Sequence, residues 1–260
     1  MTRLLPMINA ELLKLRKRRG LFWLMLVLTV FVIIVANAVG TIYHVSNPVK
    51  YPAIGGATGF VNFLGVFNIV GALAAVLIGA TAGAQDTSSG VFRSMVATGQ
   101  SRIKLALVRI PGGLLMLLPM LVVGFGLEVV AAFVLADGSP TPDATTMVVA
   151  FGWLMAIAVL NYTVAVGLAA LLRARGTAIG LLIAWQLAAS RLIEAIPNFG
   201  NWRGLISSVA TDRFLPGATD VIQLRRDSIT LSLAAAIAVV IAWIVVSTAL
   251  GVWRTATQEA

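Results

Sequence analysis

Six long apolar stretches occupy most of the chain, and short polar segments separate them. They run over residues 21–43, 59–84, 110–135, 147–172, 177–196 and 229–252. Each is close to the ~20 residues that an α-helix needs to cross a bilayer, and none shows the alternation of a membrane β-strand. The pattern predicts an all-α integral membrane protein with six transmembrane helices, in which residues 1–260 form a single transmembrane domain.

Lysine and arginine residues are distributed unevenly between the two sides of the predicted membrane domain. Thirteen lie on the side that holds both termini, and six lie on the other side when Arg191 is counted with the last outer loop. Because cytoplasmic loops carry the excess of positive charge, we expect both termini in the cytoplasm. This topology accounts for the net charge of +9 without nucleic acid as a partner.

Residue types that many catalytic and metal sites require are missing from the sequence. The chain has no cysteine and a single histidine, His44, to which we assign no role. This composition excludes disulfides, thiolate chemistry and a histidine-ligated metal site. None of the lysines stands in the G-x-x-x-x-G-K-S/T spacing of a phosphate-binding loop. We therefore expect no enzymatic activity, cofactor or metal in this chain.

Two cytoplasmic segments have helical patterns of their own. In residues 1–20, leucine and isoleucine recur every three or four positions among basic residues, which predicts an amphipathic helix on the membrane surface. Between the second and third stretches, residues 86–88 have capping side chains and residues 99–101 form a break, so we expect a short helix over residues 87–100. Four basic residues would hold that helix at the anionic inner leaflet: Arg93, Arg102, Lys104 and Arg109.

The motifs in these two segments resemble those of the permease subunits of type-2 ABC export transporters, including actinobacterial drug and antibiotic exporters. That family has an N-terminal E-x-x-K helix, and Glu11 and Lys14 match it. After its second span the family has an acidic residue, a G-T-x-R motif and a small residue followed by arginine. The matching positions here are Asp86, Gly90, Arg93 and Ser101-Arg102, with Asp86 in place of the usual glutamate and Val91 in place of the usual threonine.

The resemblance implies how the chain would work. Residues 87–100 would be the coupling helix that seats on a separate ABC ATPase subunit, which would hold ATP and Mg. Two permease chains would form the pathway, and residues 197–228 would form short helices that re-enter the outer half of the membrane. The location would be a bacterial plasma membrane, and the exported substrate would be a hydrophobic or amphipathic drug, peptide antibiotic or lipid.

Polar residues within the predicted spans are candidates for the pathway, because such residues are costly in lipid. They are Glu128, Asn161, Gln186 and Arg191. Glu128 could contact substrate, snorkel to the outer interface or pair with Arg191, and Arg191 could instead pair with Glu194 three residues later. Asn161 and Gln186 are residue types that form hydrogen bonds between membrane helices.

Two glycine pairs would let helices approach closely, either within one chain or between two. They are Gly79 with Gly83 and Gly176 with Gly180.

Two other functions fit parts of the pattern. An ion- or proton-coupled secondary transporter would use Glu128 as its coupling carboxylate and would need no ATPase. A structural or sensory membrane subunit would account for the long cytoplasmic segment. The single carboxylate within the spans and the lack of an evident inverted repeat count against the coupled transporter.

Overall fold

The computed structural model describes residues 4–88, 90–97, 99–216, 229 and 231–257. Every regular element in these ranges is a helix. Six helical segments are long and apolar enough to cross a membrane: Arg19–Ser46, Gly56–Asp86, Arg102–Val134, Ala144–Leu172, Arg175–Ala195 and Leu233–Ala256. The predicted all-helical, multi-pass membrane architecture is therefore confirmed.

The first and fifth spans each contain a π-helical turn. The first comprises α2 (Arg19–Leu26), η1 (Val27–Phe31) and α3 (Val32–Ser46). The fifth comprises α8 (Arg175–Ala184), η2 (Trp185–Ala189) and α9 (Ser190–Ala195). The other spans are single helices: α4 (Gly56–Ser88), α6 (Arg102–Val134), α7 (Ala144–Leu172) and α12 (Leu233–Ala256). Such turns often occur at functional sites.

Two of the single helices are much longer than a bilayer requires. α4 and α6 have 33 residues each, or about 50 Å at 1.5 Å per residue, against a hydrocarbon core of about 30 Å. α6 begins at Arg102, whereas the apolar stretch predicted a start at 110. The difference arises because apolar composition marks the membrane boundary, and a helix can continue beyond it.

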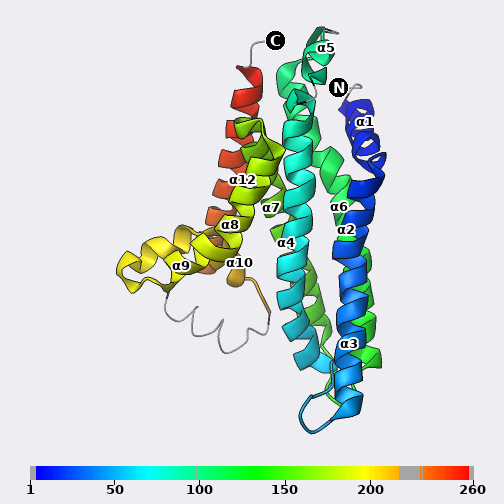
Figure 1. The fold of residues 1–260 in the computed structure, drawn as a ribbon. Coiled ribbons are helices and arrows are strands. Elements are labelled where there is room, and N and C mark those ends of the chain that lie inside the picture. Colours follow the sequence, from blue (N-terminus) through cyan, green and yellow to red (C-terminus); the bar gives the residue numbers. More distant parts are fainter. Residues whose placement is uncertain (1–3, 89, 98, 217–228, 230, 258–260) are drawn as a thin grey trace.

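The two helices predicted from the motifs outside the spans are present, with altered boundaries. α1 (Leu4–Arg16) and α5 (Val91–Ala97) lie at the same end of the bundle as the C-terminal end of α12 (Figure 1). Gly99, with φ +80°, stands in the break before α6. Residues 86–88 were expected to cap a new helix, but they form the last turn of α4.

The core is built around α4, which packs most extensively against α7 and also contacts α6 and α8. A Cβ atom on Gly79 would lie 2.5 Å from the Tyr162 carbonyl oxygen, and one on Gly83 would collide with the Val166 carbonyl oxygen. The first glycine pair therefore brings two helices of the same chain together. Gly176 and Gly180 have no atom within 4 Å of an added Cβ, so the second pair faces open space.

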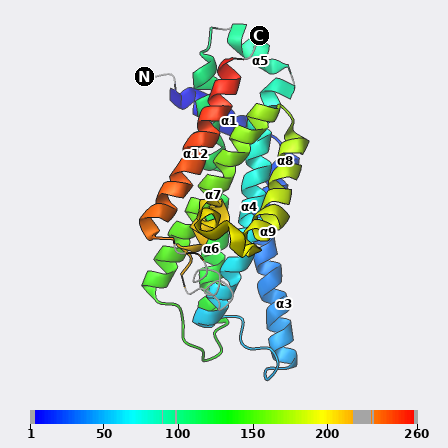
Figure 2. The ribbon, with the colours of Figure 1, turned by 90° about the vertical axis from the view of Figure 1, so that its left-hand side faces the viewer.

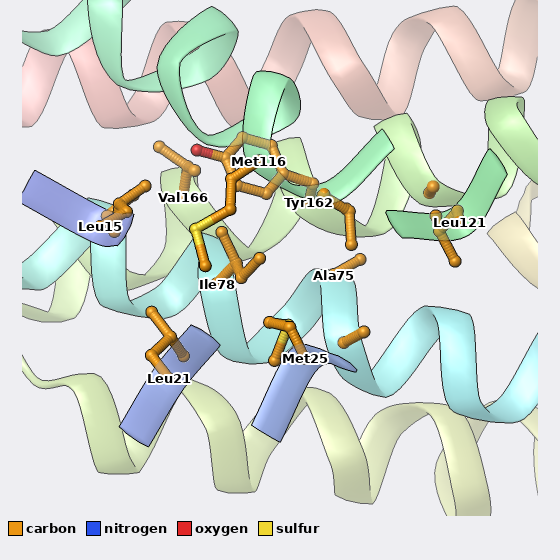
Figure 3. Packing of buried hydrophobic residues seen from close by; sticks show 13 residues of the cluster. Leu15, Leu21, Met25, Ala75, Ile78, Met116, Leu121, Tyr162 and Val166 are labelled. Carbon is orange, nitrogen blue, oxygen red and sulfur yellow. The ribbon is translucent and has the colours of Figure 1, made fainter. Parts of the chain in front are cut away.

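A buried apolar cluster fastens α1 to the membrane helices. Leu15 of α1 is fully buried with Ile78 of α4, Met116 of α6 and Tyr162 of α7 (Figure 3). α1 is thus part of the bundle, and not only a helix on the membrane surface, because its apolar face covers protein as well as any lipid.

The fifth span is followed by η3 (Pro197–Leu205) and α10 (Ser207–Asp212). Figures 1 and 2 place α9 and α10 part-way along the bundle, well short of the C-terminal ends of α3 and α6. Three apolar side chains of η3 are exposed: Phe199, Trp202 and Leu205. Residues 217–228, the rest of the segment expected to re-enter the membrane, lie outside the described residues.

Candidate functional site: a buried charge cluster and a mid-membrane cavity

Four charged side chains from three helices meet near the end of the bundle that holds α1 and α5. Lys14 Nζ of α1 lies 2.6 Å from Glu11 Oε2 and 2.8 Å from Asp86 Oδ1 of α4. Arg109 Nη2 of α6 lies 3.1 Å from Asp86 Oδ2. Glu11, Lys14 and Asp86 were singled out from separate motifs of the sequence, and the fold brings them into one charge cluster.

Arg109 is the residue of this cluster that sequence reasoning misplaced. It was expected at the lipid surface, but only 2% of it is exposed. Its Nη1 donates to the Gly83 carbonyl oxygen at 3.1 Å, and its own carbonyl oxygen accepts from the Tyr162 hydroxyl at 2.5 Å. Arginine is favoured at such a buried position because its planar fork can serve a carboxylate and a carbonyl together.

The two carboxylates of the cluster have different surroundings. Asp86 accepts from both Lys14 and Arg109, whereas Glu11 contacts Lys14 and has a buried Oε1 without a hydrogen-bond partner. Burial raises the pKa of Glu11, although the Lys14 ammonium acts in the opposite direction. Asp86 is therefore the centre of the cluster, and Glu11 is its less stabilised member.

The remaining residues predicted to couple to an ATPase lie around α5. Gly90, with φ +72°, forms the turn between α4 and α5, and an added Cβ there would meet nothing within 4 Å. Arg93 belongs to α5, and its side chain lies outside the described part of the structure. Arg102 Nη1 donates to the Ala256 carbonyl oxygen at 3.4 Å, which links the start of α6 to the end of α12.

A second group of predicted residues meets near the middle of the bundle. Gln186 Nε2, in the π-helical turn η2, donates to Asn161 Oδ1 of α7. Asn161 Nδ2 donates in turn to the Ile157 carbonyl oxygen at 3.0 Å. Both residues thus take part in a hydrogen bond between helices, as their residue types suggested, and the structure shows that they are each other's partners.

This amide pair forms part of the wall of a cavity of about 170 Å³ between α4, α7, α9 and α10. Its polar lining comprises Asn68, Asn161, Gln186, Ser190, Arg191, Ser207, Ser208 and Thr211. Ile69, Ala72, Leu73, Ile157 and Leu160 are among its apolar lining residues. A cavity with this lining suits a ligand that has both apolar and hydrogen-bonding groups.

Arg191 belongs to an ionic network that joins α9 to α10. Arg191 Nη1 lies 3.0 Å from Glu194 Oε2, which is the second of the two pairings considered for Arg191, and 3.9 Å from Asp212 Oδ2. Ser208 Oγ also donates to Glu194 Oε1. Arg203 Nη1 donates to the Glu194 carbonyl oxygen at 3.0 Å. Asp212 and Arg203 were not predicted as site residues. The only indication of them in the sequence was the unusually high charge of the segment after the fifth span.

Glu128 lies apart from this network and pairs with a residue that sequence reasoning missed. Only 1% of Glu128 is exposed, and its Oε2 accepts from Asn37 Nδ2 at 2.8 Å. Snorkelling and pairing with Arg191 were therefore wrong, because α6 turns this carboxyl group toward α3. Asn37 Oδ1 is buried without a hydrogen-bond partner. Asn37 could have been found by the same criterion as the other polar residues within the spans.

Among the residues that the structure describes, no group of three or more acidic or histidine side chains is placed to hold a metal ion. Neither a protein-family model nor a curated protein matches this chain. The features available for a functional assignment are thus the charge cluster beside α5 and the mid-membrane cavity.

Proposed function

We propose that this chain is the transmembrane subunit of an ATP-driven exporter of the type-2 ABC class, acting with a separate ATPase that holds ATP and Mg. The main support is the charge cluster of Glu11, Lys14, Asp86 and Arg109. It ties α1 to the ends of α4 and α6, next to the turn at which α5 begins. A partner that pushes on α1 or α5 would therefore move both long helices.

α4 offers a direct mechanical connection from that end to the mid-membrane cavity. Asp86 lies in its last turn, and Asn68 of the same helix lines the cavity. The two positions are separated by about 27 Å along an uninterrupted helix, which moves as a rigid element. In this mechanism a displacement received at α5 changes the shape of the cavity, and the chain does no chemistry on the substrate.

A second permease chain would complete the pathway. Four small residues at intervals of four lie exposed along α8 and η2: Gly176, Gly180, Ala184 and Ala188. Such a row lets a helix of another chain approach closely in a membrane. In this proposal the termini are cytoplasmic, the membrane is a bacterial plasma membrane, and η3 and α10 re-enter the outer leaflet with the exposed side chains of η3 in lipid.

The turn at Gly90 provides the test of coupling to an ATPase. Proline fixes φ near about −65°, so Gly90→Pro must change the turn that presents α5, where φ is +72°. We expect this variant to fold but to lose at least about tenfold in ATPase association, measured by purifying the tagged chain from its native membrane and assaying bound ATPase activity.

Gly138→Pro is a matched control, since Gly138 has φ +78°, equally open surroundings and a place after the outer end of α6. It should leave the association unchanged. Recovery of folded wild-type chain without any ATPase would contradict the proposed function.

A proton-coupled secondary transporter is the second candidate, because Glu128 is a buried carboxyl group whose polar contact among the described residues is with Asn37. Glu128→Gln keeps an acceptor for Asn37 and removes the titratable group. An ATP-driven exporter should retain transport in this variant, and its transport should survive collapse of the proton gradient. Loss of transport in both conditions would favour the proton-coupled mechanism.

A further inference from the structure

A second cavity, of about 350 Å³, lies between α7, α8 and α12 and was not predicted from any motif. α8 and α12 both pack against α7, and Figure 2 shows the three helices side by side. On α7 the lining residues extend from Leu160 to Leu171, a length of about 16 Å along the helix. All three helices belong to segments long and apolar enough to cross a membrane, so we expect lipid beside this cavity.

The cavity has an apolar end and a polar end. Toward the end of the bundle that holds α1 and α5, the cavity is lined by leucines of all three helices, Leu171, Leu181 and Leu250. At the other end it is lined by Asn161, Gln186 and Ser207, the same residues that line the smaller cavity. The Asn161–Gln186 hydrogen bond therefore lies in the wall that the two cavities share.

Several polar groups of this cavity are left available for a ligand. Within the described part of the chain, Gln186 Oε1 and the hydroxyl groups of Ser207 and Ser247 have no hydrogen-bond partner. Polar groups in lipid are costly unless they are satisfied, and hydrocarbon chains cannot satisfy them. A ligand that fills the cavity should thus carry at least one hydrogen-bonding group beside its apolar body.

Two tryptophans define the outer limit of the cavity. The rings of Trp185 and Trp243 lie with their centroids 6.3 Å apart, and Trp243 Nε1 donates to the Leu205 carbonyl oxygen at 2.9 Å. The polar end is thus anchored to η3 and shielded by aromatic rings. The polar groups lie beside the tryptophans, deep in the bundle, and the leucines lie toward the end that holds α1 and α5. A phospholipid in the leaflet at that end would have the opposite polarity, because its head group would lie where the leucines are. A compact amphiphile fits better than a phospholipid.

We infer that the cavity between α7, α8 and α12 is a binding site for a compact amphiphile dissolved in the bilayer, whose polar group bonds to the Gln186 and Ser207 side chains at the polar end. Its volume falls within the range of about 300–1,000 Å³ that is usual for small-molecule sites. This binding site does not depend on the proposed ATPase partner. Only the further step, in which the ligand passes the Asn161–Gln186 pair into the smaller cavity, rests on the exporter mechanism.

Photolabelling of the purified full-length chain in lipid nanodiscs tests the site. The probe is a medium-chain alcohol that carries an aliphatic diazirine, and the labelled peptides are identified by mass spectrometry with and without excess unlabelled alcohol. Val246→Trp should fill the cavity, whereas Val245→Trp is a matched control, because these neighbours are 55% and 57% exposed and only Val246 lines the cavity.

We expect saturable labelling of α7, α8 and α12 that falls at least about fivefold in Val246→Trp and remains unchanged in Val245→Trp. Gln186→Leu should weaken competition by the alcohol but not by the corresponding alkane. Labelling that is spread over all lipid-facing helices, or that is equal in the two tryptophan variants, would overturn the proposal. Saturable labelling in a chain that recruits no ATPase would support this site and would contradict only the exporter mechanism.

Discussion

Asp86→Asn should lower the free energy of unfolding by about 3–5 kcal/mol, because it leaves the buried Arg109 without its counterion. Asp86 accepts from Lys14 Nζ at 2.8 Å and from Arg109 Nη2 at 3.1 Å. Glu11 can still pair with Lys14, but among the described residues no carboxylate other than Asp86 forms an ion pair with Arg109. The measurement is the unfolding midpoint of the purified chain in mild detergent, with denaturant titration for the free energy.

Two further variants determine whether the loss of stability in Asp86→Asn arises from the charge cluster. Asp137→Asn removes an aspartate whose side chain is 74% exposed and pairs with His44, and it should change stability by less than about 1 kcal/mol. The double variant Asp86→Leu/Arg109→Met removes both central charges and should be more stable than Asp86→Asn. A double variant that is less stable than the single one would show that the charges themselves hold the helices together.

Gly79→Leu should prevent folding or cost at least about 3 kcal/mol, because overpacking against backbone atoms cannot be relieved by a side-chain rotation. Its first side-chain atom would already lie 2.5 Å from the Tyr162 carbonyl oxygen and 2.8 Å from the Ala165 Cβ. α4 and α7 would have to separate along their whole contact. Yield and monodispersity in size-exclusion chromatography, followed by thermal unfolding, measure this effect.

Gly180→Leu is the matched variant, since Gly180 lies in a similar G-x-x-x-G pattern but faces open space. We expect it to fold normally and to shift the chain from dimer to monomer in cross-linking and native mass spectrometry. A folded Gly180→Leu that remains a dimer would place the second chain elsewhere. A well-folded Gly79→Leu would contradict the close packing of α4 on α7.

The two glycine pairs share a sequence pattern but differ in what they contact. Both pairs have the same G-x-x-x-G spacing, so the pattern predicts close approach for both. Which side of a helix faces its own chain depends on how all six spans are arranged. That arrangement is a property of the whole bundle, and the five residues of a G-x-x-x-G motif do not indicate it.

The charge cluster was partly predictable for a similar reason. Motif spacing singled out Glu11, Lys14 and Asp86, but nothing in it indicated that they touch one another. Arg109 was placed at the lipid surface because a basic residue near a membrane boundary usually contacts lipid. Its inward direction follows from the position of Asp86 on a neighbouring helix, which is tertiary information.

The sequence by itself determined that the chain crosses a membrane with six helices, because length and continuous apolar composition are sufficient for a helix in lipid. It also located Glu128, Asn161, Gln186 and Arg191 as polar residues within the spans. Only the tertiary structure decided their partners: Glu128 with Asn37, Asn161 with Gln186, and Arg109 with Asp86. The physical reason is that hydropathy depends on composition along one helix, whereas a hydrogen bond or ion pair depends on the rotation and depth of two helices at once.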